Sequence, residues 1–167
     1  MSEAAMPRDR RSEDSPETRR EGRRSYRVQA RSDAPVESVW PLLAEARRWK
    51  EWTFLTRSEL ERDGRPEPDG VGAVRHFTRY GIGSREEVLA FDPPTHLAYS
   101  ILSGFPVRNY RADVTLSPDE GGTQITWTAT FDEKVPGTGR LTELMLGRMI
   151  GGFASGLARY AAKTPAS

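Results

Sequence analysis

The stretch "TQITWTATFDEKVPGTGRLTELMLGRMIGGFASGLARYAAK", residues 123–163, changes its hydrophobic period once. As far as Phe131, apolar and polar residues alternate, which is the pattern of a β-strand with one buried face. From about Gly139 onward, apolar residues recur every three or four positions, which predicts one long amphipathic helix over residues 139–163. The end of the chain is therefore predicted to be a strand followed by a helix that packs on a sheet, as in the α+β class.

The predicted helix contains glycines at an unusual density. They are Gly147, Gly151, Gly152 and Gly156. Since each glycine costs about 1 kcal/mol relative to alanine in a helix interior, we expect another part of the chain to approach this helix backbone closely. The four-residue spacing also matches the small-residue motif of membrane helix pairs. Arg148, Arg159 and the short apolar span argue against that alternative.

The segments before this strand are predicted to be further strands, because they are β-rich or alternating and are bounded by turn residues. They are residues 25–31, 53–63, 73–80, 84–92, 96–102 and 107–118. Short turns join most of them, which predicts an antiparallel meander. Together with residues 123–131, this gives a sheet of about seven strands.

The segment between the first two strands, "PVESVWPLLAEARRWKEW" (residues 35–52), holds three of the four tryptophans in the chain. Its apolar residues fall on one helical stripe, and it is predicted to form two short helices. Pro41 lacks an amide hydrogen and crowds the preceding turn, so we expect a kink or a late start in the first of them.

Residues 1–24 carry charges of both signs and almost no large apolar side chain. Such a segment cannot bury enough surface to offset the entropy of ordering it. We therefore predict a disordered N-terminal tail over residues 1–24 and a folded domain over residues 25–164. A nucleic-acid-binding arm is the alternative for the tail, but its acidic residues nearly cancel its arginines.

The composition excludes several classes of chemistry. The 167 residues include no cysteine, which rules out disulfides, thiolate catalysis, iron–sulfur clusters and cysteine zinc sites, and which fits a cytoplasmic location. The net charge of +1 implies no strong field for nucleic acid, and no apolar run is long enough for a membrane span. The two histidines lie far apart, and no phosphate loop, dinucleotide fingerprint or nucleophile elbow is present, so we expect neither a metal nor a cofactor.

Residues 25–162 resemble the polyketide cyclase/dehydrase and lipid transport branch of the START-like (SRPBCC) superfamily, which includes the birch-pollen allergens. The resemblance is carried, in this order, by "APVESVWPLLAEARRWKEW", "GVGAVRHF", "EEVLAFDPPTHLAYSI", "YRADVTLSPDEGGTQITWTATF" and the C-terminal helix. Pro41 departs from the unbroken first helix of that superfamily. The resemblance implies a helix-grip fold, in which a curved antiparallel sheet wraps the long helix. The two short helices, with Trp40, Trp49 and Trp52, would close one end of the hollow between them.

The resemblance leaves three functions open. The first is binding of a small hydrophobic ligand, such as a lipid or a polyketide, for storage, transport or sensing. The second is a polyketide cyclase or aromatase/dehydratase that works by positioning and general acid/base catalysis. The third is a regulatory module that binds a protein partner. We expect a small hydrophobic molecule as the partner and no nucleic acid or membrane span; both a monomer and a homodimer remain open.

Candidate residues for the hollow follow from this picture. Those expected to bind ligand are Trp52, Arg75, Phe77, Glu87, Leu89, Tyr99, Tyr110, Trp127, Phe131, Met145, Met149 and Phe153. The candidates for catalysis are Arg75, His76, Glu87 and Tyr110. The alternative for many of the apolar ones is that they simply fill the core.

The polar candidates on the third strand exclude one another. Arg75 and His76 are adjacent, so only one of them can face the hollow, and the pattern does not decide which. An inward Arg75 needs a partner, because an unpaired buried charge is very costly. Glu87 on the neighbouring strand could supply that partner, and the pair could bind a carboxylate or enol of a ligand; an ordinary surface ion pair is the alternative. An inward His76 could serve as a general acid or base near neutral pH, although a structural or exposed histidine is the alternative.

Overall fold

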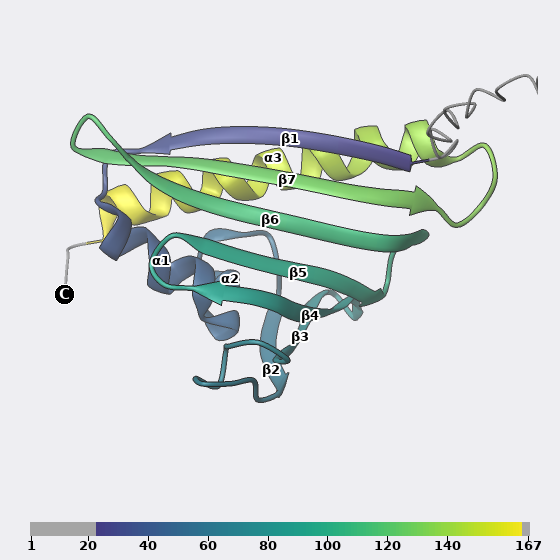
Figure 1. Ribbon diagram of the computed structural model, residues 1–167, viewed down its shortest axis with the longest axis horizontal. Coiled ribbons are helices and arrows are strands. Elements are labelled where there is room, and N and C mark those ends of the chain that lie inside the picture. Colours follow the sequence, from purple (N-terminus) through teal and green to yellow (C-terminus); the bar gives the residue numbers. More distant parts are fainter. Residues whose placement is uncertain (1–22, 165–167) are drawn as a thin grey trace, which may run out of the picture.

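The protein is built on one seven-stranded antiparallel sheet, seen in a computed structural model that describes residues 23–164. The strands are β1 (Arg23–Ser32), β2 (Arg57–Arg62), β3 (Val74–Arg79), β4 (Ile82–Asp92), β5 (His96–Ser103), β6 (Val107–Asp119) and β7 (Gly122–Glu133). The helices are α1 (Val36–Ala44), the 3₁₀ turn η1 (Ala46–Arg48), α2 (Trp49–Trp52) and α3 (Gly139–Lys163). Figure 1 shows these elements.

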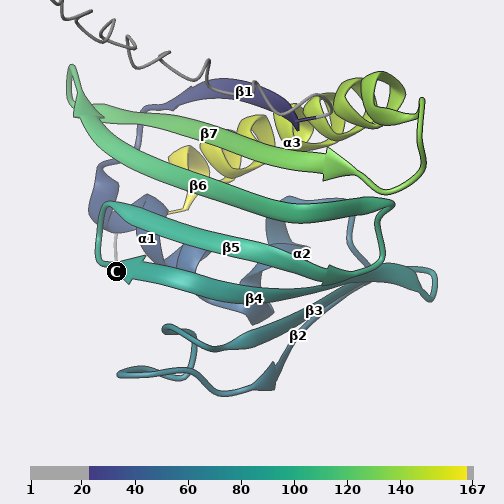
Figure 2. The same ribbon diagram turned by 45° about the vertical axis from the view of Figure 1, so that its right-hand side comes forward.

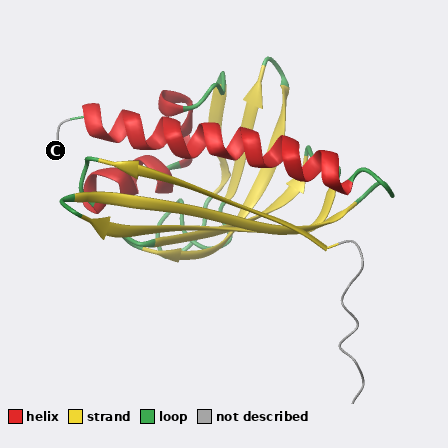
Figure 3. Ribbon diagram, turned by 90° about the horizontal axis from the view of Figure 1, so that it is seen from above, coloured by secondary structure: helices red, strands yellow, loops and turns green. Residues whose placement is uncertain are grey.

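The strand order is β1-β7-β6-β5-β4-β3-β2. Strands β2 to β7 form a meander, and β1 joins it beside the last strand, so that β1 and β2 are the two edges (Figure 2). The sheet curves around α3, which lies along one face and packs most closely against β1 and β7 (Figure 3). The predicted helix-grip architecture is confirmed, including the bounds of the long helix.

The boundary between tail and domain differs slightly from the prediction. Arg23 and Arg24 already belong to β1, in which they pair with Asp132 and Phe131 of β7. The rest of the predicted tail, residues 1–22, lies outside the described residues.

The two short helices sit at the end of α3 that carries the C-terminus (Figure 1). Trp49 and Trp52 are buried there, and their indole N–H groups donate to the carbonyl oxygens of Leu43 at 2.8 Å and Leu42 at 3.0 Å. Helix α1 begins at Val36 and contains Pro41, so the late helix start that we considered is wrong. The tryptophans are therefore anchored by hydrogen bonds at their polar edges, and their rings face the core.

Among the four glycines in the interior of α3, the expected close approach occurs at one position. A Cβ atom on Gly156 would lie 2.3 Å from the carbonyl oxygen of Trp52, so only glycine fits there. At Gly147 and Gly151 the nearest side-chain atoms would be at ordinary contact distance, 3.8 and 3.9 Å, and at Gly152 nothing lies within 4 Å. No helix among residues 23–164 is both long and apolar enough to cross a membrane.

Candidate functional site

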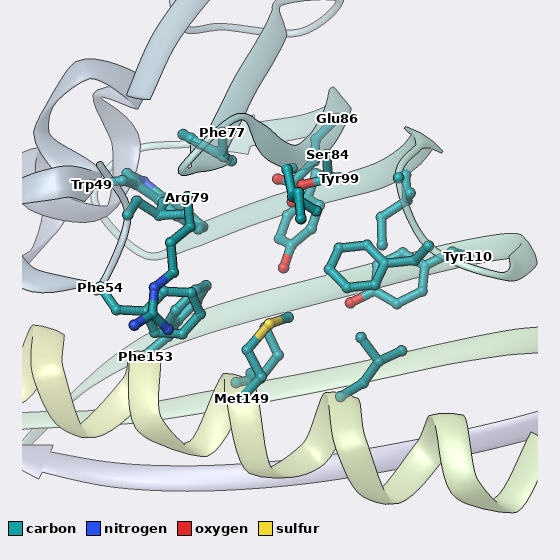
Figure 4. A pocket seen from close by; sticks show the side chains of 18 of the residues that line it. Trp49, Phe54, Phe77, Arg79, Ser84, Glu86, Tyr99, Tyr110, Met149 and Phe153 are labelled. Carbon is teal, nitrogen blue, oxygen red and sulfur yellow. The ribbon is translucent and has the colours of Figure 1, made fainter. Parts of the chain in front are cut away.

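A cavity of about 370 Å³ lies between the sheet and α3 (Figure 4). Its walls come from α2 and the loop that follows it, from β3 to β6 with the turns that join them, and from the middle of α3. Most of the lining is aromatic or aliphatic and includes Trp49, Phe54, Phe77, Phe105, Leu146, Met149, Ile150 and Phe153. The polar side chains in the lining are Arg79, Ser84, Glu86 and three tyrosines, Tyr80, Tyr99 and Tyr110.

Strand β3 directs Arg75, not His76, toward the interior. Arg75 is fully buried, and its Nη2 donates to Oε2 of Glu86 at 2.9 Å. The two residues lie directly opposite each other in the β3–β4 register. His76 is half-buried, and the alternation of the strand turns it to the opposite face.

The expected pairing of Arg75 with Glu87 is wrong, because Glu86 takes that place. Glu87 has the other parity on β4, so its side chain faces outward, and its Oε1 accepts from Nη2 of Arg62 at 2.8 Å. Strands β2 to β4 thus carry two ion pairs on opposite faces: a buried pair between β3 and β4 (Arg75–Glu86) and an exposed pair between β2 and β4 (Arg62–Glu87).

Aromatic rings surround the part of the Arg75 guanidinium that Glu86 does not bind. Its Nε and Nη1 are buried and have no hydrogen-bond partner among residues 23–164. The guanidinium carbon lies 4.7 Å from the ring centroid of Trp49, 4.9 Å from that of Tyr99 and 5.3 Å from that of Phe77. The negative face of an aromatic ring attracts a cation at these distances. One carboxyl group and three rings therefore enclose the positive charge.

Glu86 is the acid that lines the cavity. Burial removes water from its carboxylate and raises its pKa, and the opposing effects of Arg75 and of a hydrogen bond with Ser84 do not cancel that increase. Figure 4 shows Glu86, Ser84 and Tyr99 grouped on the sheet side of the cavity, across from Met149 of α3. The carboxyl of Glu86 thus holds a proton at higher pH than an exposed glutamate does.

The phenols of Tyr99 and Tyr110 are neutral hydrogen-bonding groups. Burial raises the pKa of both well above the ordinary value for tyrosine. The hydroxyl of Tyr99 accepts from Nε1 of Trp127 at 3.1 Å, and the hydroxyls of Tyr110 and Tyr26 lie 2.5 Å apart. Each phenol is therefore held in place by a partner outside the cavity lining.

The structure divides the residues predicted to bind ligand into three groups. Those that line the cavity are Phe77, Tyr99, Tyr110, Met149 and Phe153. Those that are buried outside the lining are Trp52, Arg75, Trp127 and Phe131. Those that lie outside the lining and are partly or largely exposed are Glu87, Leu89 and Met145. Leu89 shares the outward parity of Glu87 on β4, and α3 presents Leu146 to the cavity in place of Met145.

Sequence reasoning missed several lining residues. Glu86 and Ser84 have the inward parity of β4, which becomes readable only once Arg75 is known to face inward. Phe54 and Arg79 approach each other at the cavity, with the guanidinium carbon 5.0 Å from the ring centroid. Phe54 lies outside the strands, and no periodic pattern places such a residue.

The sequence over residues 23–163 matches the family model described as polyketide cyclase / dehydrase and lipid transport. The chain belongs to this family. Membership confirms the resemblance seen in the sequence. The match covers nearly all the described residues. A comparison with curated proteins finds no match for this sequence.

Solved structures resemble this member of the polyketide cyclase/dehydrase and lipid transport family in fold. The protein XoxI from Bacillus cereus is 20% identical, with 85% of this chain and 96% of that chain covered and a TM-score of 0.68. Ara h 8.0201 is 17% identical over 86% and 100% of the two chains, with a TM-score of 0.67. TTHA0849 from Thermus thermophilus is 18% identical over 84% and 100%, also with a TM-score of 0.67. At these identities the likeness shows the shared fold.

Proposed function

We propose that this protein binds a small, mostly apolar molecule in the cavity between its sheet and α3. The observation that carries the proposal is a space of about 370 Å³ with aromatic and aliphatic walls. Ligand pockets of proteins are of about 300–1,000 Å³ and are mostly apolar, with a few polar groups that fix orientation. Storage, transport and sensing of a ligand all require such a cavity, so the proposal covers each of these roles.

The walls combine rigid and adaptable side chains. Trp49 stacks on Phe77 with 4.6 Å between ring centroids and meets Phe153 edge-on at 6.2 Å, which fixes the aromatic part of the wall. Met149 contributes an unbranched thioether that can adjust to the shape of a guest. This arrangement supports binding by apolar burial, with orientation set by the few polar groups.

The test compares two methionines one helical turn apart. Met149 lines the cavity, whereas Met145 is 46% exposed and lies outside the lining. We expect M149W to fill the cavity and to weaken binding of 1-aminoanthracene, an uncharged fluorescent probe, by about tenfold or more. The matched variant M145W should bind the probe as the wild type does. Equal affinity of the wild type and M149W in a fluorescence titration would refute the proposal.

A second candidate is catalysis in the same cavity, of the cyclase or dehydratase kind. It is favoured by Glu86, a buried carboxyl with a raised pKa that lines the cavity together with the Tyr110 hydroxyl. Such a carboxyl holds a proton at higher pH than an exposed glutamate and can pass it to or take it from a substrate, and a phenol can polarise a carbonyl group by donating to it. With a substrate in hand, E86Q should lower kcat by about 10²–10⁴-fold with little change in KM. A pure binding protein shows no turnover to lose.

A further inference from the structure

The two charged residues of the buried pair differ in their access to the cavity. Arg75 is 0% exposed and does not contribute to the lining, while Glu86 lines the cavity and is 7% exposed. Rings that themselves face the cavity, those of Trp49, Phe77 and Tyr99, lie against the guanidinium. A guest molecule in the cavity therefore meets the carboxyl group of Glu86 and not the guanidinium of Arg75.

We propose that Glu86 makes the cavity selective for uncharged ligands: its carboxyl group accepts a hydrogen bond from a hydroxyl group of the guest, while Arg75 lies out of reach of anionic guests. This inference rests on the proposed binding function and specifies the ligand class of the same site.

The chemistry of the wall supports both halves of the proposal. The carboxyl oxygens of Glu86 can accept a hydrogen bond from a hydroxyl group of the guest. The hydroxyls of Ser84 and Tyr110 lie in the same lining and can donate to a carbonyl group. A carboxylate guest would lose its water beside Glu86 without gaining a cation, and burial of an unpaired charge is very costly.

One cation in the lining could oppose this selectivity. Arg79 lies beside Phe54 and Phe153, away from the group formed by Glu86, Ser84 and Tyr99 (Figure 4). Its guanidinium carbon lies 5.0 Å from the ring centroid of Phe54 and 5.6 Å from that of Tyr80, which is 81% exposed. An anion could bind to Arg79 near the solvent. The experiment must therefore distinguish binding at Arg79 from binding beside Glu86.

The experiment measures the affinity of three probes of similar shape: naphthalene, 2-naphthol and 2-naphthoate, by quenching of tryptophan fluorescence at pH 7. We expect 2-naphthol to bind roughly 2- to 12-fold more tightly than naphthalene, the range of one net hydrogen bond. We expect 2-naphthoate to bind more weakly than naphthalene. E86Q should keep the preference for 2-naphthol, because an amide oxygen also accepts a hydrogen bond from a hydroxyl group.

The decisive variant replaces both members of the buried pair, R75M/E86L, because removal of one member alone leaves a buried charge and endangers folding. It should bind naphthalene and 2-naphthol equally. The matched control E87L changes the neighbouring, outward-facing glutamate and should keep the wild-type preference.

Two outcomes would overturn the proposal. Equal affinities of the wild type for naphthalene and 2-naphthol would show that Glu86 forms no net stabilising hydrogen bond with the hydroxyl group of the guest. Tighter binding of 2-naphthoate than of 2-naphthol would remove the exclusion of anions. In the latter case, loss of the effect in R79M would place the anion at Arg79. Neither outcome touches the binding function itself, which fails if M149W binds 1-aminoanthracene as tightly as the wild type does or if naphthalene does not compete with 1-aminoanthracene for the cavity.

Discussion

Arg75 shows how a full charge can be kept inside a small domain. Its single carboxyl partner is Glu86, and aromatic rings cover the remaining N–H groups. Removal of one member of such a buried pair typically costs about 3–5 kcal/mol, whereas exposed pairs contribute about 0–1 kcal/mol. We therefore expect R75M to lower the free energy of unfolding by several kcal/mol and R62M, in the exposed pair on the other face, by less than about 1 kcal/mol.

Urea denaturation of both variants checks this prediction. Similar losses in R75M and R62M would mean that the aromatic surroundings and the burial of Arg75 add nothing to its ion pair.

Glu86 should make stability depend on pH in a direction opposite to that of most carboxylates. Burial raises its pKa above the ordinary value of 4.5, so the folded state binds more protons than the unfolded state between the two values. The contribution of Glu86 to stability is thus fully present below pH 4.5 and is lost as the pH rises through the raised pKa. The difference in free energy of unfolding between E86Q and the wild type should move in favour of E86Q over that interval. A difference that stays constant with pH would contradict the raised pKa.

His96 provides a second titration, on the outer surface. Its Nδ1 lies 2.9 Å from Oδ2 of Asp92, and its Nε2 lies 2.9 Å from Oδ1 of Asp113. Partial burial would lower its pKa, but hydrogen bonds to these two aspartates raise it above the ordinary 6.5. The stabilisation is present below pH 6.5 and is lost as the pH rises through the raised value. We expect H96Q to cost about 1 kcal/mol at pH 5.5 and close to nothing at pH 9, measured by thermal unfolding. An equal cost at both values would show that the ion pairs contribute nothing.

At the scale of elements, α3 and α2 come into contact at Gly156. An alanine usually gains about 1 kcal/mol over glycine in a helix. At Gly156, however, the new methyl group would meet the backbone oxygen of Trp52 at 2.3 Å, so the two helices would have to move apart. We expect G156A to be destabilising and G152A, where nothing lies within 4 Å, to be stabilising by about 0.5–1 kcal/mol. Equal thermal shifts in the two variants would refute the packing argument.

The pairing of strands also sets the limit of what the sequence could predict about the site. Alternation on β4 shows that Glu86 and Glu87 face opposite sides, but it does not show which one is inside. The answer depends on the register with β3, which places Glu86 opposite Arg75. Sequence reasoning chose Glu87, and with it Leu89, because a register between strands is a non-local property that a single chain pattern does not contain.

At the scale of the whole molecule, the fold was predictable because each element has a local period. The change of period between residues 123–131 and 139–163 predicted the last strand and the long helix at nearly their observed bounds. The cavity is different, because it is the space left after helix and sheet have packed. Trp127 and Phe131 have the same pattern as lining residues and yet fill the core. Only the packed arrangement separates residues that face an empty space from residues that face one another.

The position of β1 beside β7 has a consequence for biosynthesis. In a nascent chain leaving the ribosome, the first strand has no neighbour until the last strand has been translated, since Val28 pairs with Trp127. Such long-range pairing must close a large loop of chain and is intrinsically slow. The meander from β2 onward can assemble during translation. Strand β1 stays unpaired, with its apolar face exposed, until β7 provides the sheet edge to which it binds.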